Sequence, residues 1–156
     1  MYYSLDGNTR FVAQEMAAKL QAELLELEPR ENVSRKEPVK HLQGIKQSFV
    51  KGAPELVEPG IDLRDYELLL IGTPVWSFNF SPPVRSFLKE YNPEGHRVIL
   101  FCTHRGFPGM TLRNLKLELQ QSNEIIGTID FRNPLKNPES TRERINKFIS
   151  SSGDIQ

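Results

Sequence analysis

The sequence has one cysteine, Cys102, among its 156 residues, so it can form neither an internal disulfide nor a metal site with several cysteine ligands. Lysine plus arginine equals aspartate plus glutamate, 20 each. This balance argues against nucleic acid or an anionic membrane as the main partner. No apolar run approaches the length that spans a bilayer, and there is no cationic leader. We therefore expect a cytoplasmic protein.

Several catalytic motifs are also missing. The sequence has no nucleophile elbow of a hydrolase, no phosphate-binding loop with a lysine and no cluster of metal ligands. We accordingly assign no catalytic side chain and no metal ligand. The hydrophobic fraction of 38% and the charged fraction of 26% are those of an ordinary globular protein. At this length, residues 1–156 are predicted to form a single domain.

What the sequence does contain is a regular alternation of strand and helix patterns. Helical spacing of apolar residues predicts helices at 8–21, 38–51, 82–91, 112–119 and 138–149. Ser81 is a candidate cap for the third of these. Short apolar or alternating runs predict strands at 1–4, 23–28, 67–73, 98–103 and 125–131, the last weakened by Gly127. Such alternation predicts a three-layer α/β/α sandwich around a five-stranded parallel sheet.

The loop from Ser4 to Thr9 has the composition of an anion site. It joins a short strand to a helix, and the first amides of a helix have no partner within the helix and attract negative charge. Gly7 allows backbone geometry that other residues resist. Side chains of Ser4, Asn8 and Thr9 can add hydrogen-bond donors. An ordinary strand-to-helix turn is the alternative interpretation of these residues.

Two further loops follow predicted strands. Residues 74–81 are rich in aromatic side chains and contain Trp76, the only tryptophan, while residues 103–109 contain His104 and two glycines. The carboxyl ends of parallel strands lie at one edge of a sheet, and ligands of such folds bind there. We therefore expect all three loops to converge on one site.

Three segments resemble the flavodoxin family: Ser4-Leu5-Asp6-Gly7-Asn8-Thr9, Gly72-Thr73-Pro74-Val75-Trp76 and Cys102-Thr103-His104-Arg105-Gly106. The resemblance implies the strand order 2-1-3-4-5 and a flavin mononucleotide (FMN) cofactor. It implies that the phosphate is held by Ser4, Leu5, Asp6, Gly7, Asn8 and Thr9. It also implies that the isoalloxazine ring is lined by Thr73, Pro74, Val75 and Trp76, and on its other edge by Thr103, His104 and Gly106. Flat aromatic walls and uncharged donors suit the chemistry of such a ligand.

Asp6 departs from the family pattern, in which a threonine commonly bonds the phosphate. A carboxylate repels a phosphate dianion, so we expect Asp6 to be turned outward as the residue of an Asp-Gly turn. Phe78, Phe80 and Phe107 are weaker candidates for the aromatic wall, and core cover is the favoured interpretation of each. Among the remaining polar residues, we expect His104 to be solvated, with contact to the ring edge or a substrate as the alternative. Arg105 is expected either to face solvent or to stabilise an anionic reduced flavin. We expect His41 and His96 to lie at the surface. Cys102 is expected to be an inert core thiol.

The resemblance implies an FMN-binding flavoprotein that acts in electron transfer or as a small oxidoreductase. The partner would be a redox protein or a small-molecule acceptor. A carrier that docks redox proteins commonly has an acidic face, so the charge balance favours an oxidoreductase that takes electrons from a nicotinamide cofactor. The alternative is a cofactor-free interaction module on the same fold, for which Asp6 is the best argument.

Overall fold

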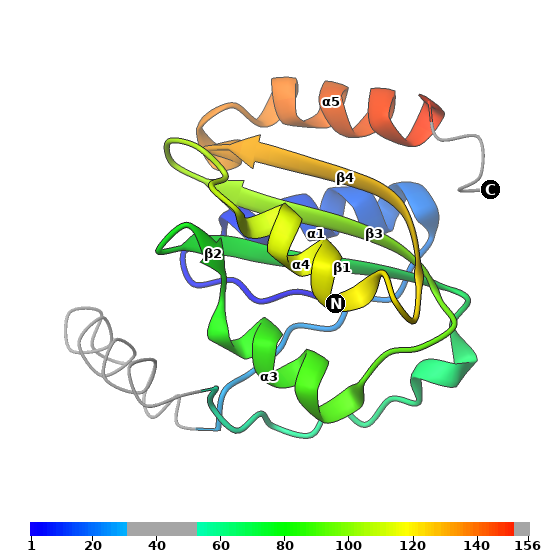
Figure 1. Cartoon of the computed structure of the whole chain (residues 1–156). Helices are drawn as coiled ribbons and strands as arrows, with labels where there is room; N and C mark the ends of the chain where they lie inside the picture. Colours follow the sequence, from blue (N-terminus) through cyan, green and yellow to red (C-terminus); the bar gives the residue numbers. More distant parts are fainter. Residues whose placement is uncertain (31–52, 152–156) are drawn as a thin grey trace.

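The structure is a computed structural model that describes residues 1–30 and 53–151. The predicted helix at 38–51 lies outside the described residues. Its main elements, in chain order, are α1 (Asn8–Leu20), β1 (Leu68–Trp76), β2 (Asn79–Phe80), α3 (Pro82–Tyr91), β3 (Arg97–His104), α4 (Thr111–Leu119), β4 (Glu124–Arg132) and α5 (Pro138–Ser151) (Figure 1). Short 3-10 helices lie at Leu63–Asp65 and Pro134–Lys136. The four described helices begin within a residue of the predicted positions. Gly7 at the N-cap of α1 and the prolines that begin α3 and α5 mark these points locally.

The predicted sheet of five parallel strands is not confirmed. The sheet has four strands in the order β2-β1-β3-β4, in which β1, β3 and β4 are parallel and β2 is antiparallel. Neither 1–4 nor 23–28 forms a strand. Tyr2 instead makes single parallel bridges to Glu26 and to Gly72. Residues 1–3 thus lie between residues 23–28 and β1, but they supply too few backbone groups for a continuous ladder.

The predicted aromatic loop at 74–81 is wrong in part, since β1 extends to Trp76 and turns directly into β2. Ser77 and Phe78 connect the two strands with φ angles of 48° and 65°, and Trp76 pairs with Asn79. Left-handed geometry at both central residues is the turn that matches the twist of a two-residue hairpin. Phenylalanine rarely adopts it, so sequence patterns did not indicate a hairpin here.

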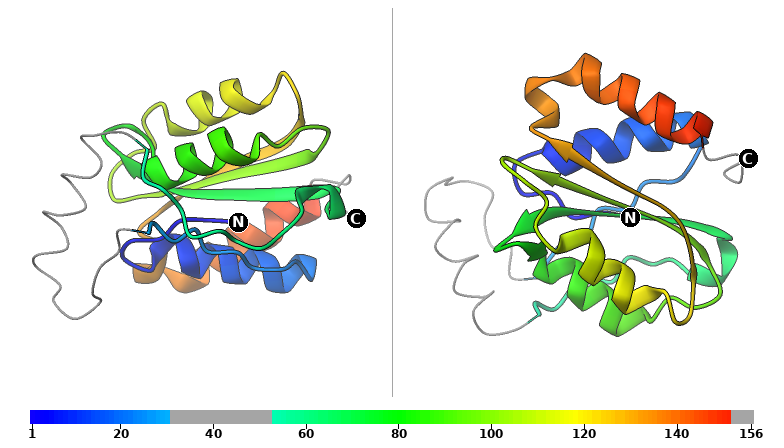
Figure 2. Two further views of the ribbon diagram at one scale, coloured as in Figure 1. Left: turned by 90° about the horizontal axis from the view of Figure 1, so that it is seen from below. Right: turned by 45° about the horizontal axis from the view of Figure 1, so that its top comes forward.

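Helices cover both faces of the sheet: α3 and α4 lie on one face, and α1 and α5 lie on the other (Figure 2). Side chains alternate between the two faces of each strand, so the core is divided into two clusters, one on each side of the sheet. On the α3/α4 side, Ile71 and Leu100 pack with Phe87 and Leu115 in one buried cluster. On the α1/α5 side, Ile99, Phe101 and Phe131 pack with Val12, Met16 and Ile145 in another. The continuous apolar runs of β1 and β3 are therefore buried on both faces, as expected of central parallel strands.

Two glycines permit aromatic rings to lie directly on the sheet. A Cβ atom at Gly72 would lie 2.0 Å from Cζ of Phe101, and one at Gly127 would lie 2.7 Å from Cζ of Phe148. Gly127 does not end β4, which continues from Glu124 to Arg132. Its role is to leave room for a ring of α5 against the strand.

Candidate functional site

The three loops predicted to converge do meet at the carboxyl ends of the strands, where they surround a cleft of about 400 Å³. The predicted residues that line it are Leu5, Asp6, Asn8, Pro74, Val75, Trp76, Thr103, His104 and Gly106. Four further residues line it: Ser77, which was not considered from the sequence, and Phe78, Arg105 and Phe107, which were only weaker candidates. The remaining predicted residues, Ser4, Gly7, Thr9 and Thr73, do not line the cleft.

The first loop is held in its turn by Asp6. Gly7 has a φ of 86° and stands at the N-cap position of α1, where it has no side chain to cap the helix. Oδ1 of Asp6 accepts a hydrogen bond of 3.1 Å from the amide of Asn8. Oδ2 of the same carboxylate lies 3.6 Å from the guanidinium of Arg105. Asp6 is thus the turn residue that the sequence suggested, and its charge is paired across the cleft mouth.

Buried hydroxyl groups lie behind the cleft. The hydroxyls of Thr9 and Thr103 share a hydrogen bond of 2.8 Å and tie the start of α1 to the end of β3. The hydroxyl of Thr73 donates to Oγ of Ser81 at 3.0 Å and accepts a hydrogen bond from the amide of Ser81. These bonds stabilise the hairpin formed by β1 and β2. Ser81 stands at the N-cap of α3, but its side chain does not cap the helix.

Ser4 is the exception among these groups. Its Oγ atom is buried and has no hydrogen-bond partner among the described residues. A buried hydroxyl without a partner is costly, so such a group commonly marks a place for a ligand or water. The first loop therefore contains a buried hydroxyl, that of Ser4, without a hydrogen-bond partner among the described residues.

An aromatic pair lies at the rim of the cleft, and the interpretation of Phe78 and Phe107 as core cover is wrong. Each side chain is 60% exposed, and the two rings stack with centroids 5.4 Å apart. The amide of Met110 donates to the carbonyl of Phe78 at 2.9 Å, and Gly109 packs so closely that a Cβ there would lie 2.9 Å from the Phe78 backbone. These contacts hold the left-handed hairpin and keep the Phe78 ring at the rim. Phe80, by contrast, is core cover as predicted.

His104 is not the solvated loop residue that the sequence suggested. Its side chain is only 5% exposed, and Nε2 lies 2.9 Å from Oδ2 of Asp130 on β4. The other ring nitrogen, Nδ1, is buried without a hydrogen-bond partner among the residues that the structure describes. His96, predicted at the surface, is also buried, with Nδ1 2.8 Å from the carbonyl oxygen of Tyr66. His41 lies outside the described residues.

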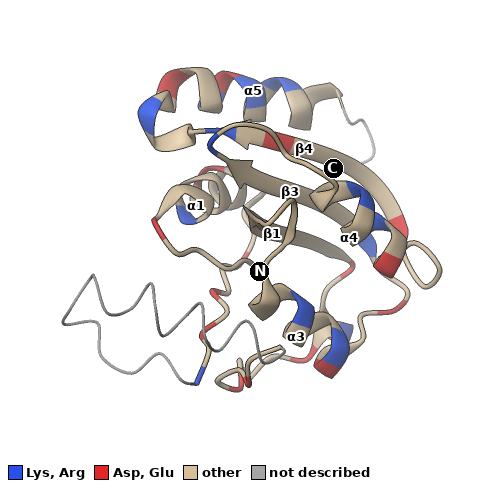
Figure 3. Ribbon diagram, turned by 60° about the vertical axis from the view of Figure 1, so that its left-hand side comes forward, with Lys and Arg blue, Asp and Glu red and all other residues tan. Residues whose placement is uncertain are grey.

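The remaining charges around the cleft are ordinary. Arg105 is solvent-facing as expected, with 85% of its side chain exposed. Positive and negative residues both occur on α3, α4 and α5 rather than forming a face of one sign (Figure 3).

Cys102 is buried in β3, and burial raises the pKa of its thiol to about 12, so it is the inert core thiol that was predicted. Within residues 1–30 and 53–151 there is no cluster of potential metal ligands, and no helix is long and apolar enough to cross a membrane.

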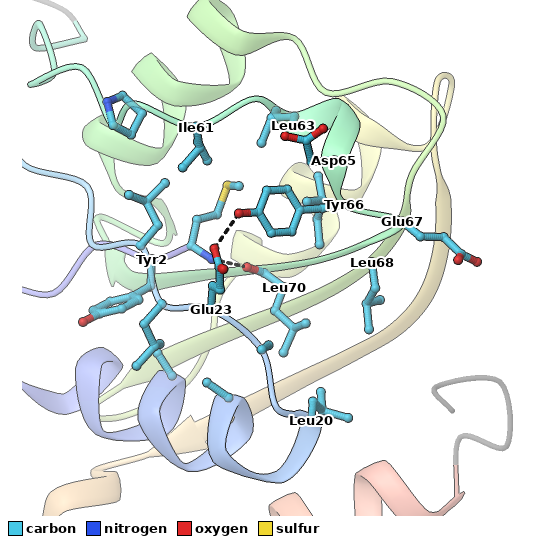
Figure 4. Close-up of a pocket in the computed structure, with 18 of the residues that line it drawn as sticks. Tyr2, Leu20, Glu23, Ile61, Leu63, Asp65, Tyr66, Glu67, Leu68 and Leu70 are labelled. Carbon is cyan, nitrogen blue, oxygen red and sulfur yellow. Dashed lines mark hydrogen bonds between the residues drawn. The ribbon is translucent and has the colours of Figure 1, made fainter.

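A second cavity, of about 620 Å³, lies at the opposite end of the sheet, between the end of α1 and the start of β1 (Figure 4). Two pairs of polar groups lie in its wall. The amino group of Met1 donates to the carbonyl of Leu70 at 2.8 Å, and the hydroxyl of Tyr66 donates to Glu23 at 2.5 Å. Burial lowers the pKa of the Met1 amino group to about 5. The cleft at the carboxyl ends, where the three loops meet, is the better candidate site, because ligands of parallel α/β sheets bind at that edge.

Comparison with known proteins agrees with this fold. The family model described as Flavodoxin matches residues 1–151, so the chain belongs to the flavodoxin family. It is similar to the structure of a flavoprotein from Lactobacillus acidophilus NCFM in complex with FMN, with 22% identity, 95% of each chain covered and a TM-score of 0.69. The apo-form of the flavoprotein from that organism matches with 24% identity over 87% of this chain and 92% of that one, at a TM-score of 0.65.

A two-electron reduced flavodoxin from Megasphaera elsdenii is similar as well, with 20% identity, 94% and 99% coverage and a TM-score of 0.56. At these identities, the structural neighbours bear on the fold alone. The comparison with curated proteins gives no match.

Proposed function

We propose that this chain binds FMN in the cleft at the carboxyl ends of its strands. Ser4, Gly7, Asn8 and Thr9, with the first amides of α1, would hold the phosphate, and Leu5 and Asp6 would shape that loop. Pro74, Val75 and Trp76 would line the isoalloxazine ring on one side, while Thr103, His104 and Gly106 bound its other edge. Thr73 would act indirectly, by stabilising the hairpin formed by β1 and β2 through its hydrogen bonds to Ser81.

The observation that carries this proposal is the convergence of three loops on one cleft that has aromatic walls. His104 lines this cleft, whereas Ser4, whose buried Oγ has no partner among the described residues, belongs to the first loop but not to the lining. Trp76 from β1 and the stacked Phe78 and Phe107 supply flat apolar surfaces. A flat ring suits these aromatic walls, and an anionic end suits the start of α1. The FMN complex of the similar Lactobacillus flavoprotein supports the choice of this ligand.

The Asp6 carboxylate is compatible with this ligand because its charge is already engaged. It accepts the Asn8 amide and faces Arg105, so Arg105 offsets the repulsion that a phosphate would meet. The same contacts have a cost, since the Asn8 amide is then unavailable to the phosphate. We therefore infer a phosphate site built mainly on the amides after Asn8, with the Ser4 hydroxyl.

FMN would supply the redox chemistry, and the chain's residues would bind it, orient it and set its potential. We infer a role in electron transfer or as a small oxidoreductase. The cleft lining contains one acidic and one basic residue, Asp6 and Arg105, and this balance favours a small-molecule acceptor over a partner with a strongly charged docking face. A cleft that is open to solvent leaves room for such an acceptor beside the ring.

Titration of the purified apo protein with FMN, followed by flavin fluorescence, tests the proposal. We expect saturable quenching and a yellow protein after removal of free flavin. Trp76→Ala should weaken FMN binding, whereas Trp76→Phe, which keeps an aromatic wall, should retain most of it. Absence of binding to a folded wild-type protein would contradict the proposal and favour the cofactor-free interaction module. If FMN binds, mixing the loaded protein with NADH or NADPH separates an oxidoreductase from a carrier.

A further inference from the structure

Met1 lines the cavity at the end of the sheet opposite the cleft, and its backbone pairs with β1 at the edge of that cavity (Figure 4). The amide of Gly72 donates to the carbonyl of Met1 at 3.0 Å, and the amide of Tyr3 donates to the carbonyl of Gly72 at 3.2 Å. The amino group of Met1 donates to the carbonyl of Leu70 at 2.8 Å. These three bonds follow the evenly spaced pattern of a parallel ladder, so the cavity lies where this ladder stops.

On the β1 side, backbone groups face the cavity beyond the last of these bonds. Glu67 faces the other way, because its carbonyl accepts a hydrogen bond of 3.0 Å from the amide of Arg97 at the start of β3. Leu68 and Leu70 therefore face the cavity. Residues 1–3 bond only to the carbonyl of Leu70 at these two positions. The amide of Leu70 and both backbone groups of Leu68 are left for a further segment of strand.

The opposite side of the cavity offers a similar row of backbone groups. The amide of Tyr2 donates to the carbonyl of Leu25 at 2.9 Å, and the amide of Leu27 donates to the carbonyl of Tyr2 at 2.8 Å. Continued by one position, this row places the Leu25 amide and the Glu23 carbonyl beside a residue that is joined to Met1. Because residues 1–3 pair with both sides, the two sides are spaced for one strand between them.

The cavity is apolar on both faces of the sheet. Leu20, Leu68 and Leu70 pack against the core cluster of the α1/α5 side, and all three are only partly buried. Ile61 and Leu63 line the cavity from the α3/α4 side. Side chains of a strand alternate between the two faces, so successive apolar residues would cover both walls, as in a buried parallel strand.

The charges favour an occupant that is joined to Met1 over a separate molecule. Burial lowers the pKa of the Met1 amino group to about 5, because a charged ammonium is poorly solvated there. An amide at the same position would keep the bond to Leu70 and has no charge to desolvate. Glu23, Asp65 and Glu67 line the cavity, and the described residues contribute no lysine or arginine to its lining. A positive charge is therefore favoured at the outer end of the occupant.

We propose that this cavity seats a strand of two or three apolar residues that continues from the amino group of Met1, parallel to β1. The residue joined to Met1 would bond to Glu23 and Leu25 on one side. The next residue would bond to Leu68 and Leu70 on the other. These last two are two positions apart, about 7 Å along a strand, which sets the length of the segment. The inference is independent of the flavin site.

Chains in which Lys-Val-Ile precedes Met1, released from a cleavable tag, test this. Lys-Gly-Ser at the same place is the matched control of equal length and charge. Amide hydrogen exchange is measured by NMR. The Leu25 and Leu70 amides should exchange at least about tenfold more slowly with Lys-Val-Ile than in the chain that begins at Met1, and by less than about twofold with Lys-Gly-Ser. The Arg97 amide, already bonded to Glu67, reports any general stabilisation of this end of the sheet.

Nuclear Overhauser contacts give the second readout. We expect contacts from the added valine to Leu68 and from the added isoleucine to Glu23. An extension that stays unstructured, or equal protection with both extensions, would overturn the inference. Loss of the fold with Lys-Val-Ile but not with Lys-Gly-Ser would overturn it as well.

Addition of the free tripeptide Lys-Val-Ile separates a joined strand from a separate ligand. The tripeptide should leave the exchange of the Leu25 and Leu70 amides unchanged in the chain that begins at Met1. Protection by the free tripeptide would show a site for separate peptides and would overturn the continuity with Met1. None of these readouts involves flavin, so their failure would leave the proposed FMN site unaffected.

Discussion

The hydroxyl oxygens of Thr9 and Thr103 lie 2.8 Å apart and are fully or almost fully buried, which joins the first loop to the third behind the cleft. Thr9 begins α1 and Thr103 is near the end of β3, so this bond fixes how the proposed phosphate loop sits against the ring-binding loop. Both residues were predicted to contact the cofactor. The hydrogen bond gives Thr9 a positioning role through its hydroxyl.

Removing one hydroxyl of this pair should destabilise the protein. Thr9→Val leaves the Thr103 hydroxyl buried without a partner, at an expected cost of about 1–3 kcal/mol in unfolding free energy. Chemical denaturation measures this loss in unfolding free energy. In the double variant Thr9→Val, Thr103→Val the loss should be clearly smaller than the sum of the two single losses. Additive losses would show that the two hydroxyls do not interact.

Gly72→Ala should disrupt the packing between β1 and the core on the α1/α5 side. The new Cβ would lie 2.0 Å from the Phe101 ring, which is almost fully buried and cannot move freely. We expect a loss of about 1–3 kcal/mol or more in unfolding free energy. Gly106→Ala is the matched control, because no atom lies within 4 Å of its Cβ position, and it should stay within about 0.5 kcal/mol. Phe101→Leu should restore part of the stability in the Gly72→Ala background; no restoration would contradict the steric explanation.

Cys102 should be unreactive in the folded protein. Thiolate is the reactive form, and burial raises the pKa of this thiol to about 12. A disulfide-exchange reagent at pH 8 should therefore label it only after denaturation. The same shift has a consequence for stability. Above about pH 9 the unfolded chain loses the thiol proton while the native state keeps it, so the thiol's contribution to stability falls as pH rises toward 12. Rapid labelling of the native protein at pH 8 would contradict its burial.

Asp6→Asn should strengthen FMN binding. The asparagine oxygen can still accept the Asn8 amide and keep the turn, while the negative charge next to the phosphate is removed. We expect the FMN affinity to rise by roughly threefold to tenfold, about 1 kcal/mol at a separation of several ångströms in a water-like dielectric. Riboflavin affinity should change by less than about twofold. An equal loss for both ligands would instead mean that the carboxylate is needed to hold the loop.

Local features of the sequence predicted the helix starts, the two central strands and the convergence of the loops. Gly7, the Pro82–Pro83 pair and the apolar run of 98–103 each act within a few residues, so their effects can be recognised without tertiary information. The burial of His104 could not be recognised in this way, because its partner Asp130 stands 26 residues further along the chain. Likewise the partner of His96 is the carbonyl of Tyr66, 30 residues earlier.

The hairpin and the aromatic rim depended on tertiary contacts too. Left-handed geometry at Ser77 and Phe78 is held by Gly109 and Met110, which are remote in sequence. Helical and strand periodicity describe buried faces and carry no information about such a turn. Phe78 and Phe107 were therefore assigned to the core, although the third loop holds them at the surface. Ser77, which was not considered from the sequence, and the weaker candidates Phe78, Arg105 and Phe107 all lie in these two loops.

The most direct test of the flavin site is to map the backbone amides that change when FMN is added to 15N-labelled protein. We expect the largest NMR shift changes in residues 4–10, 74–78 and 103–107, which come from three separate parts of the chain. Residues 20–25 and 68–70, which line the cavity at the other end of the sheet, should be nearly unaffected. Shift changes confined to that second cavity, or none at saturating FMN, would contradict the proposal that the three loops form one flavin site.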